Sequence, residues 1–250
     1  MVYFVGAGPG DPELITVKGR RLLAAADVII YAGSLVNKAL LASARAACEI
    51  HDSARLTLPE VVALMEQAES AGKTVVRLHT GDPSIYGAIR EQMDELAERG
   101  IVYQVVPGVS SFCAAAAALQ KEYTVPGVSQ TVILTRMEGR TGVPAGEALE
   151  SLAAHRATLI VFLSIDMIAE MTIRLQTGYP AATPAAVVYK ASWPEEQIIR
   201  GTLADIAGRV QEAGITKTAL FVVGEFLGDQ YELSRLYDES FSHGFRKAKE

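Results

Sequence analysis

Polar side chains follow an apolar run in residues 75–88, which read V-V-R-L-H-T-G-D-P-S-I-Y-G-A. Residues 75–78 have the composition of a buried strand, Thr-Gly-Asp-Pro breaks it, and a helix is expected over about 84–96. Asp82 can accept hydrogen bonds from ligand hydroxyls, and Gly81 permits close backbone approach or a positive φ. Open α/β sheets bind ligands at the carboxyl ends of such strands, so the stretch predicts a ligand site. An ordinary strand-to-helix turn with a capping carboxylate is the open alternative.

A second glycine-rich stretch, residues 6–12, follows a strand expected at 2–5 and precedes a helix expected over about 13–25. A dinucleotide fingerprint G-x-G-x-x-G starting at Gly6 requires glycine at position 11, where this chain has Asp11. A carboxylate at a helix N-terminus is unfavourable beside a pyrophosphate but favourable as a cap of the helix. The sequence therefore argues against a pyrophosphate site and weakens the alternative of a dinucleotide-dependent oxidoreductase.

Strands and helices alternate along the whole chain, which favours sheets flanked by helices. Lys121 to Gln130, with Pro126 and Gly127, reads as a linker between domains 1–120 and 121–250. The sequence thus predicts an α/β protein of two domains, each a mostly parallel or mixed sheet flanked by helices, and it assigns no structure to the polar and aromatic tail from Gly228. Further strands are expected at 27–31, 48–51, 101–106, 131–135, 158–163, 185–190, 198–202 and 219–224. Further helices are expected at 36–46, 59–71, 112–119, 147–155, 167–177 and 203–213.

Composition limits the classes of function. The 250 residues include no run of eighteen apolar residues and no basic segment ahead of the first strand, so neither a transmembrane helix nor a secretory signal is expected. Cys48 and Cys113 do not form a disulfide framework, and a cytoplasmic location is expected. The net charge of −6 argues against nucleic-acid binding. Without a pair of histidines or cysteines at ligand spacing, no protein-bound metal is expected.

Four stretches together resemble the tetrapyrrole methyltransferases, the S-adenosylmethionine-dependent enzymes of cobalamin and sirohaem synthesis. They are GAGPGDPELITVKG, LHTGDPSIYGA, VPGVSS and VVYKASWPEE. The stretches YAGSLV, QTVILTRMEGRT and LYDESFSHGF narrow the resemblance to the branch of the family that methylates carbon 11 of precorrin-4 or cobalt-precorrin-4. The resemblance covers almost the whole chain.

This resemblance implies a two-domain tetrapyrrole methylase fold, a homodimer, and transient channelling contacts with neighbouring pathway enzymes. It implies that S-adenosylmethionine, with S-adenosylhomocysteine as its product, binds between the domains, and that the tetrapyrrole lies nearby, close to the N-terminal glycine loop. At Leu163 some relatives have methionine, and at Ala191 some have glycine. The cofactor positions carried over from the family are Pro9, Thr80, Gly81, Asp82, Ile85, Ser110, Ser111, Leu163, Ala191, Thr218 and Ala219.

The tetrapyrrole carries carboxylate arms, which arginine and lysine bind well, although most single surface cations are simply solvated. The favoured substrate positions are Gly8, Lys18, Arg20, Tyr86 and Arg136; further candidates are Tyr31, Tyr123, Arg140 and Lys190. Methyl transfer depends mainly on positioning, so no catalytic triad is expected. If a base is needed, Asp11 or His79 is nearest along the sequence, whereas a helix cap and a structural imidazole are their ordinary alternatives.

Two other readings of function remain open. A sibling methyltransferase would act at a different carbon of a corrin precursor or on uroporphyrinogen III, and trials with purified intermediates would separate it. A non-catalytic tetrapyrrole carrier would bind the pigment without needing the cofactor, which the intact TGDPSIYG turn disfavours.

Overall fold

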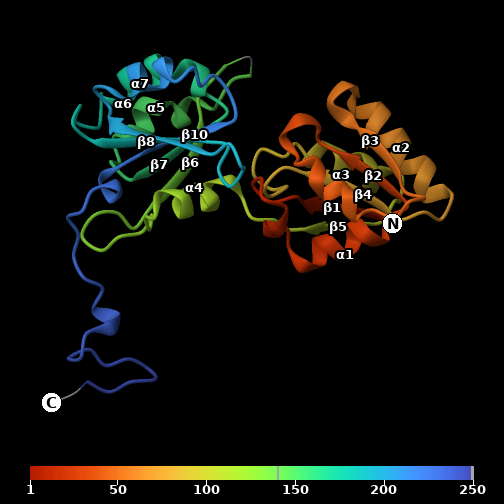
Figure 1. Ribbon diagram of the computed structural model, residues 1–250, viewed down its shortest axis with the longest axis horizontal. Coiled ribbons are helices and arrows are strands. Elements are labelled where there is room, and N and C mark those ends of the chain that lie inside the picture. Colours follow the sequence, from red (N-terminus) through yellow and green to blue (C-terminus); the bar gives the residue numbers. More distant parts are fainter. Residues whose placement is uncertain (140, 249–250) are drawn as a thin grey trace. The chain divides into compact units, whose positions relative to one another are not determined.

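The computed structural model describes residues 1–139 and 141–248 and divides the chain into two compact units (Figure 1). The first unit contains Met1–Ala115 and Lys190–Glu196. The second contains Ala116–Tyr189 and Gln197–Glu250. The chain therefore passes from one unit to the other three times, and the short segment Lys190–Glu196 belongs to the first unit although both its neighbours along the chain belong to the second.

The first unit is built on a five-stranded sheet in which every pair of neighbouring strands is parallel. The helices of this part of the chain are α1 (Val17–Ala25), α2 (Leu58–Ser70) and α3 (Arg90–Glu98), and α4 (Ser111–Leu119) starts in the first unit and ends in the second. The strands are β1 (Val2–Gly6), β2 (Val28–Tyr31), β3 (Glu49–Asp52), β4 (Val75–His79) and β5 (Tyr103–Val106), in the order β3-β2-β4-β1-β5.

Both faces of this sheet are covered, which explains the near-continuous apolar runs in its central strands. Phe4 and Val75 pack with Met65 of α2 and Leu96 of α3 in one core cluster, whereas Leu78 belongs to a second cluster on the other face. Because successive strand residues point to opposite faces, each central strand supplies apolar side chains to both clusters. The carboxyl ends of β1 and β4, at the middle of the sheet, carry the glycine-rich loops.

The second unit contains a mixed sheet in the order β6-β7-β10-β8-β9. Only β6 and β7 pair in parallel, and the other neighbours are antiparallel. Helices α5 (Leu149–Ala153), α6 (Ile168–Leu175) and α7 (Ile206–Glu212) share a core cluster with one face of the sheet. The strands are β6 (Val132–Arg136), β7 (Thr158–Phe162), β8 (Pro184–Tyr189), β9 (Gln197–Thr202) and β10 (Ala219–Val223). The two-sheet α/β fold predicted from the sequence is confirmed.

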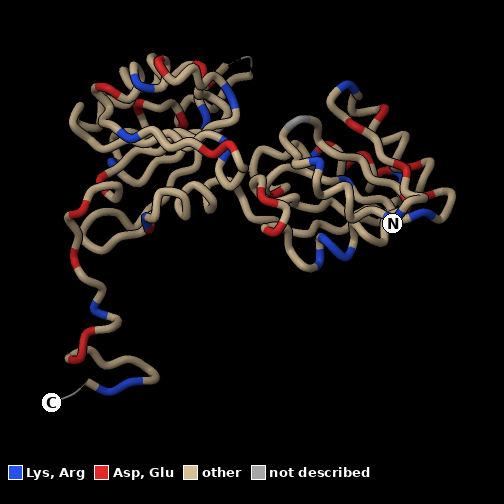
Figure 2. The backbone as a smooth tube through the Cα atoms, in the orientation of Figure 1, with Lys and Arg blue, Asp and Glu red and all other residues tan. Residues whose placement is uncertain are grey.

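The tail after Gly228 carries charges of both signs and leaves the sheet (Figures 1 and 2). It contains one 3-10 turn, Arg235–Tyr237, and the guanidinium of Arg246 donates to the carbonyl oxygens of Leu236 and Asp238. The tail is therefore held by an arginine that binds its own backbone. None of the helices in residues 1–139 and 141–248 is long and apolar enough to cross a membrane.

Several helices begin later than the sequence pattern predicts, and α3 and α1 show the reason. Residues 83–89 form a compact loop ahead of α3, so the predicted start near Ser84 is wrong. Tyr86 and Ala88 have φ values of 54° and 48°, which a right-handed helix excludes. A Cβ on Gly87 would overlap the carbonyl oxygen of Pro83, so only glycine permits this fold of the loop.

The first helix likewise begins at Val17, with the Thr16 hydroxyl as its cap, after a separate 3-10 turn at Pro12–Leu14. The predicted helix over 36–46 is 3-10 in character and spans Lys38–Ser43. Ile15, with extended backbone, separates the first 3-10 turn from α1, which apolar spacing alone reads as one helix, and Asn37, also extended, precedes the 3-10 helix.

Three glycines meet where β1, β4 and β5 end. A Cβ built on Gly6 would lie 2.5 Å from the Cα of Gly108 and 2.6 Å from the carbonyl oxygen of Gly81. A Cβ on Gly108 would overlap the same carbonyl oxygen and lie 2.7 Å from the Cα of Gly6. These backbones are closer than any side chain allows, so the three loops that leave the sheet here start from one point of contact.

Gly108→Ala is expected to lower the free energy of unfolding by about 1–3 kcal/mol or more, because the added methyl forces the three strand ends apart. Gly208→Ala is the matched control, since nothing lies within 4 Å of a Cβ built on this α7 residue. That control is expected to raise the stability by about 0.5–1 kcal/mol. Urea titrations of the two variants measure the difference, and equal midpoints would contradict the tight contact.

Candidate functional site

Asp82 joins two of the loops that leave the first sheet. One of its carboxylate oxygens accepts from the backbone N–H of Gly108 at 2.8 Å, and the other accepts from the backbone N–H of Ser84 at 2.8 Å and from the Ser84 hydroxyl. Partial burial alone would raise the pKa of this carboxyl, but the hydrogen bonds from Ser84 and Gly108 outweigh burial and hold the pKa below its ordinary value. Asp82 is therefore a fixed negative charge that also holds the loops together.

Two buried polar atoms follow one another at the end of β4. Neither Nε2 of His79 nor Oγ1 of Thr80 has a hydrogen-bond partner within the described part of the chain. Buried polar groups are normally paired, so an unpaired hydroxyl beside a glycine turn indicates a place where a bound molecule completes the hydrogen bond. Thr80 immediately precedes Gly81, which pairs with Gly8 of the N-terminal loop.

His79 is poorly suited to proton transfer. Burial first, and the positive charge of Arg77 second, lower the pKa of His79 to about 3. Only 3% of the residue is exposed, and its ring lies 6.0 Å from that of Phe4 between ring centres. Arg77 is also buried; its guanidinium donates to Gln92 at 3.1 Å and to the carbonyl of Ile30 at 3.2 Å. At neutral pH His79 is a neutral imidazole in the wall of the site.

Ser110 and Ser111 lie directly against the glycine turn. A Cβ on Gly81 would be 3.5 Å from the Cα of Ser110 and 3.6 Å from the backbone nitrogen of Ser111. The Ser110 carbonyl accepts the N–H of Cys113 at 3.0 Å, and so it caps the first turn of α4. Ile85 and Tyr86 come from the loop that replaces the predicted helix, and Tyr86 is 45% exposed there.

The N-terminal loop is held by a residue that the sequence analysis did not single out. Trp193 donates its ring N–H to the carbonyl oxygen of Pro9 at 3.0 Å, and its ring occupies the space where a side chain on Gly10 would lie. Asn37 donates to the carbonyl oxygen of Gly10 at 2.8 Å. The available signal was compositional, because Trp193 is the only tryptophan in the chain.

Asp11 and the nearby cations have defined surroundings. The Asp11 carboxylate accepts the backbone N–H of Glu13 at 2.8 Å, which is the capping role expected as its ordinary alternative. Lys18 donates to the side chain of Gln104 at 3.2 Å, and Arg20 is exposed on α1. Lys190 lies 5.5 Å from the centre of the Trp193 ring. Arg140 lies outside the described residues.

The predicted site residues of the second unit gather at one edge of its sheet. Leu163 follows the last residue of β7, and Thr218 precedes Ala219, the first residue of β10. Because Phe221 pairs antiparallel with Val161, these positions lie at the same end of two neighbouring strands. Arg136 pairs with the last residue of β7 at this edge as well.

The Arg136 guanidinium is already engaged by its own loop. It donates to the carbonyl oxygens of Met137, Thr141 and Gly142, at 3.3, 3.1 and 2.6 Å. Ser164 supports the same loop from β7, since its hydroxyl accepts the N–H of Met137 at 2.9 Å. Arg136 thus stabilises the conformation of the loop. A substrate carboxylate would bind the N–H groups of the guanidinium that these three bonds do not use.

Strained backbone marks the same stretches. Among the described residues, eight that are not glycine have a positive φ, and six of these lie in the segments that the sequence singled out: Tyr86, Ala88, Leu163, Lys190, Ser192 and Thr218. Such conformations cost about 1–3 kcal/mol each and concentrate at functional sites. The strain therefore supports the ends of β4, β7 and β8 and the start of β10 as places built for binding.

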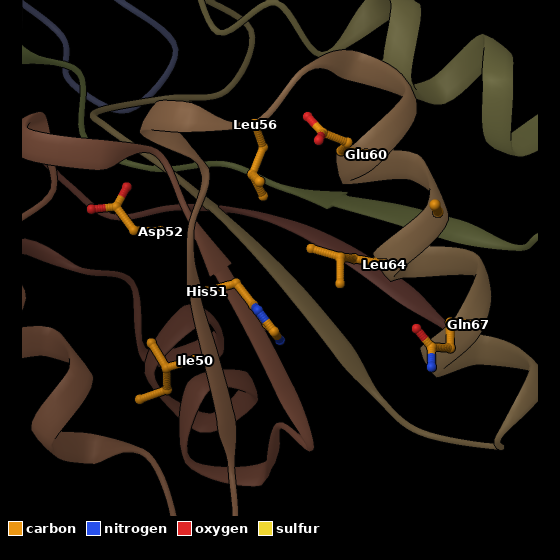
Figure 3. Close-up of a pocket in the computed structure, with 8 residues that line it drawn as sticks. Ile50, His51, Asp52, Leu56, Glu60, Leu64 and Gln67 are labelled. Carbon is orange, nitrogen blue, oxygen red and sulfur yellow. The ribbon is translucent and has the colours of Figure 1, made fainter.

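A cavity of 510 Å³ lies apart from the glycine loops, between the edge strand β3 and α2 (Figure 3). Its polar groups already serve the fold. Asp52 accepts from the Tyr31 hydroxyl at 2.9 Å, and Glu60 accepts from the backbone N–H of Thr57 at 2.7 Å. His51 lines the cavity with the apolar side chains of Leu56 and Leu64, beside these two carboxylates. Across residues 1–139 and 141–248, no cluster of histidine, cysteine and carboxylate side chains is suited to a metal ion.

A class of protein is defined by the fold and by the edge of the first sheet where Gly6, Gly81 and Gly108 meet. The sequence profile of the Tetrapyrrole (Corrin/Porphyrin) Methylases matches residues 1–207, and the chain belongs to this family.

Among curated relatives, the chain is 55% identical to a cobalt-precorrin-4 C(11)-methyltransferase of Methanocaldococcus jannaschii, across 99% of this chain and 96% of that protein. It is 48% identical to a precorrin-4 C(11)-methyltransferase of Pseudomonas aeruginosa, across 98% of both.

Among solved structures, a cobalt precorrin-4 methyltransferase matches with a TM-score of 0.89 and 47% identity, covering 91% of this chain and 96% of that one. A uroporphyrin-III C-methyltransferase of Thermus thermophilus, complexed with S-adenyl homocysteine, matches with a TM-score of 0.76 and 31% identity, covering 90% and 92%.

His79→Gln is expected to reduce the loss of stability at mildly acidic pH. The pKa of His79 is depressed in the folded protein, so below pH 6.5 the unfolded chain binds a proton that the folded chain excludes, and stability falls. The loss is about 1.5 kcal/mol between pH 6.5 and pH 5. Denaturant unfolding at several pH values measures it, with exposed His155→Gln as the control. Equal pH slopes for the wild type and His79→Gln would contradict the burial of a neutral imidazole.

Proposed function

We propose that this chain is an S-adenosylmethionine-dependent methyltransferase that acts at carbon 11 of precorrin-4 or cobalt-precorrin-4. The observation that carries the proposal is the identity of 48–55% to curated C(11)-methyltransferases across nearly the whole chain. The class of reaction is also supported by the edge of the first sheet where Gly6, Gly81 and Gly108 meet, which offers hydrogen-bonding groups for positioning a ligand.

The residues of the first unit fit the cofactor. The unpaired hydroxyl of Thr80 gives a bound nucleoside a partner, and the absence of a side chain at Gly81 leaves its backbone open. Ser110 and Ser111 add polar groups against the same turn. When bound, S-adenosylmethionine supplies a methyl group on a positively charged sulfur. The structural relative from Thermus thermophilus, solved with S-adenyl homocysteine, supports this assignment.

Asp82 gives the site its charge. Its depressed pKa keeps the carboxylate ionised at neutral pH, so it favours a cationic ligand and accepts hydrogen bonds from hydroxyl groups. Its three hydrogen bonds to Ser84 and Gly108 also mean that it does not move when a ligand arrives. A preorganised charge of this kind costs no reorganisation during reaction.

The tetrapyrrole carbon itself serves as the nucleophile in this proposal, and a protein base is not required. His79 is neutral and buried, so it does not take up a proton at physiological pH. Asp11 remains the candidate base in the N-terminal loop. Its carboxylate already accepts the backbone N–H of Glu13. Lys18, Arg20, Tyr86 and Arg136 are proposed to meet the substrate, with Gly8 providing backbone access.

The state of assembly and the cellular setting belong to the same proposal. A homodimer in the cytoplasm, with transient contacts to neighbouring pathway enzymes, follows from the family resemblance. Light scattering of the purified protein tests the dimer directly.

The test is mass spectrometry of precorrin-4 and cobalt-precorrin-4 after incubation with the protein and S-adenosylmethionine that carries a labelled methyl. We expect one labelled methyl at carbon 11. If the protein binds the cofactor but transfers the methyl only to uroporphyrinogen III, the proposed substrate is wrong and the family assignment stands. Binding of tetrapyrrole without any transfer would favour a carrier. Comparing rates on the two precorrin forms decides the cobalt preference.

Leu163→Gly is expected to weaken cofactor binding without lowering the free energy of unfolding. Leu163 is 64% exposed at a φ of 56°, so glycine relieves strain and keeps or raises the stability by up to about 1 kcal/mol. If its side chain contacts the cofactor, the dissociation constant of S-adenosylhomocysteine rises about tenfold, as measured by calorimetry. Gln120→Gly is the matched control, with a φ of 54° at an exposed position. Unchanged affinity in Leu163→Gly would remove Leu163 from the site.

A further inference from the structure

The segment Lys190–Glu196, here called the Trp193 turn, packs on the N-terminal glycine loop within the first unit. The Trp193 ring N–H donates to the carbonyl oxygen of Pro9 at 3.0 Å. A Cβ on Gly10 would overlap the Trp193 ring, with its Cγ at 2.8 Å. Gly10 therefore leaves a flat surface for tryptophan, and the hydrogen bond fixes the direction in which the ring approaches.

A second contact fixes the next residue of the loop. The backbone N–H of Asp11 donates to the Ser192 hydroxyl at 3.0 Å, and the Ser192 N–H donates to the Glu196 carboxylate at 2.7 Å. Lys190 lies 3.5 Å from the carboxylate of Glu195. Two side chains of the turn, those of Trp193 and Ser192, thus hold the backbone at Pro9 and Asp11.

The turn keeps a conformation that its own sequence does not favour. Lys190 and Ser192 have φ values of 46° and 67°, and neither is glycine. Strained residues of this kind persist only when their surroundings determine them, and here the surroundings are Pro9, Gly10 and Asp11 together with the hydrogen bonds inside the turn. The shape of the Trp193 turn and the shape of the glycine loop therefore depend on each other.

Under the function proposed above, the Trp193 turn contacts the cofactor, whereas the glycine loop, in which Pro9 is itself a carried-over cofactor position, also adjoins the tetrapyrrole. Ala191, 6% exposed, is a proposed cofactor contact and lies inside the Trp193 turn. The loop from Gly8 to Asp11 is the proposed neighbour of the tetrapyrrole. A ligand that orders one partner of a mutually dependent pair also orders the other.

We propose that Ser192 and Trp193 are positioning residues that couple cofactor binding at Ala191 to the substrate-binding shape of the Pro9–Asp11 loop. The two ligands then bind with positive cooperativity, and by linkage each raises the affinity for the other by the same factor. This inference rests on the proposed function, because it needs both ligands to bind.

The first measurement uses the only tryptophan of the chain as its reporter. S-adenosylhomocysteine added to the wild-type protein is expected to reduce quenching of Trp193 fluorescence by acrylamide, because the turn tightens on Gly10. Calorimetry in the same samples gives the dissociation constant. Binding without any change in quenching would overturn the coupling, whereas no binding at all would count against the proposed function instead.

The second measurement compares Trp193→Phe with Tyr179→Phe. The first variant keeps an aromatic ring on Gly10 but loses the donor to Pro9. The second loses an equivalent hydrogen bond, from the Tyr179 hydroxyl to the carbonyl oxygen of Ala157 at 2.6 Å, in the core of the second unit. In the wild type the KM for precorrin-4 is expected to fall at least about fivefold between low and saturating S-adenosylmethionine.

Trp193→Phe is expected to reduce this ratio to less than about twofold and to weaken S-adenosylhomocysteine binding, with kcat at saturation of both ligands nearly unchanged. Tyr179→Phe is expected to keep the wild-type ratio. Ser192→Ala, which loses the acceptor for Asp11, should reproduce the effect if Trp193→Phe does not fold. An undiminished ratio in the folded Trp193 or Ser192 variant overturns the inference, as does a wild-type KM that is independent of the cofactor.

Discussion

The contact among Gly6, Gly81 and Gly108 is the constraint on which the rest of the first unit depends. Three parallel strands end at this point, and their backbones approach more closely than any side chain permits. The loops that follow are therefore brought to one place before any of their side chains interact. The Asp82 carboxylate then joins two of them by accepting the N–H of Gly108. Close backbone packing and one charged hydrogen bond thus shape the wall of the site.

At the end of β4, the charge that can face a ligand is the Asp82 carboxylate. Asp82 remains ionised because its hydrogen bonds outweigh partial burial. Arg77 sits below the surface and binds Gln92 and a strand carbonyl, and His79 is kept neutral by burial and by this arginine. The site can therefore hold a cationic, hydroxyl-rich ligand without a mobile charge of its own. Such an arrangement suits a reaction governed by position.

Strained backbone is a second feature, found in each unit separately. Leu163 and Thr218 of the second unit, and Lys190 and Ser192 of the Trp193 turn, all adopt a left-handed backbone without being glycine. Each follows or precedes a strand, where regular hydrogen bonding stops. Gln120 and Arg156 have the same backbone outside these stretches, so the strain supports a role only together with the family resemblance.

The sequence by itself determined the alternation of strands and helices, the two glycine turns and the family. These follow from local patterns, since apolar runs of strand length and glycine at a strand end are readable without long-range contacts. Local apolar spacing failed where close packing of the backbone decides the outcome. The helix expected at Ser84 does not form because Gly87 folds back on Pro83, and apolar spacing contains no sign of that.

Only the tertiary structure decided what Trp193 and His79 do. Trp193 stands 183 positions after Gly10 in the chain, and no rule of spacing links them, yet its ring fills the space that glycine leaves. A histidine can act as a catalytic base, but burial and the nearby charge of Arg77 lower the pKa of His79 to about 3 and remove its ability to take up a proton at neutral pH. Sequence identifies which groups are present, whereas packing fixes their partners and their charge, because both depend on residues that meet only when the chain has folded.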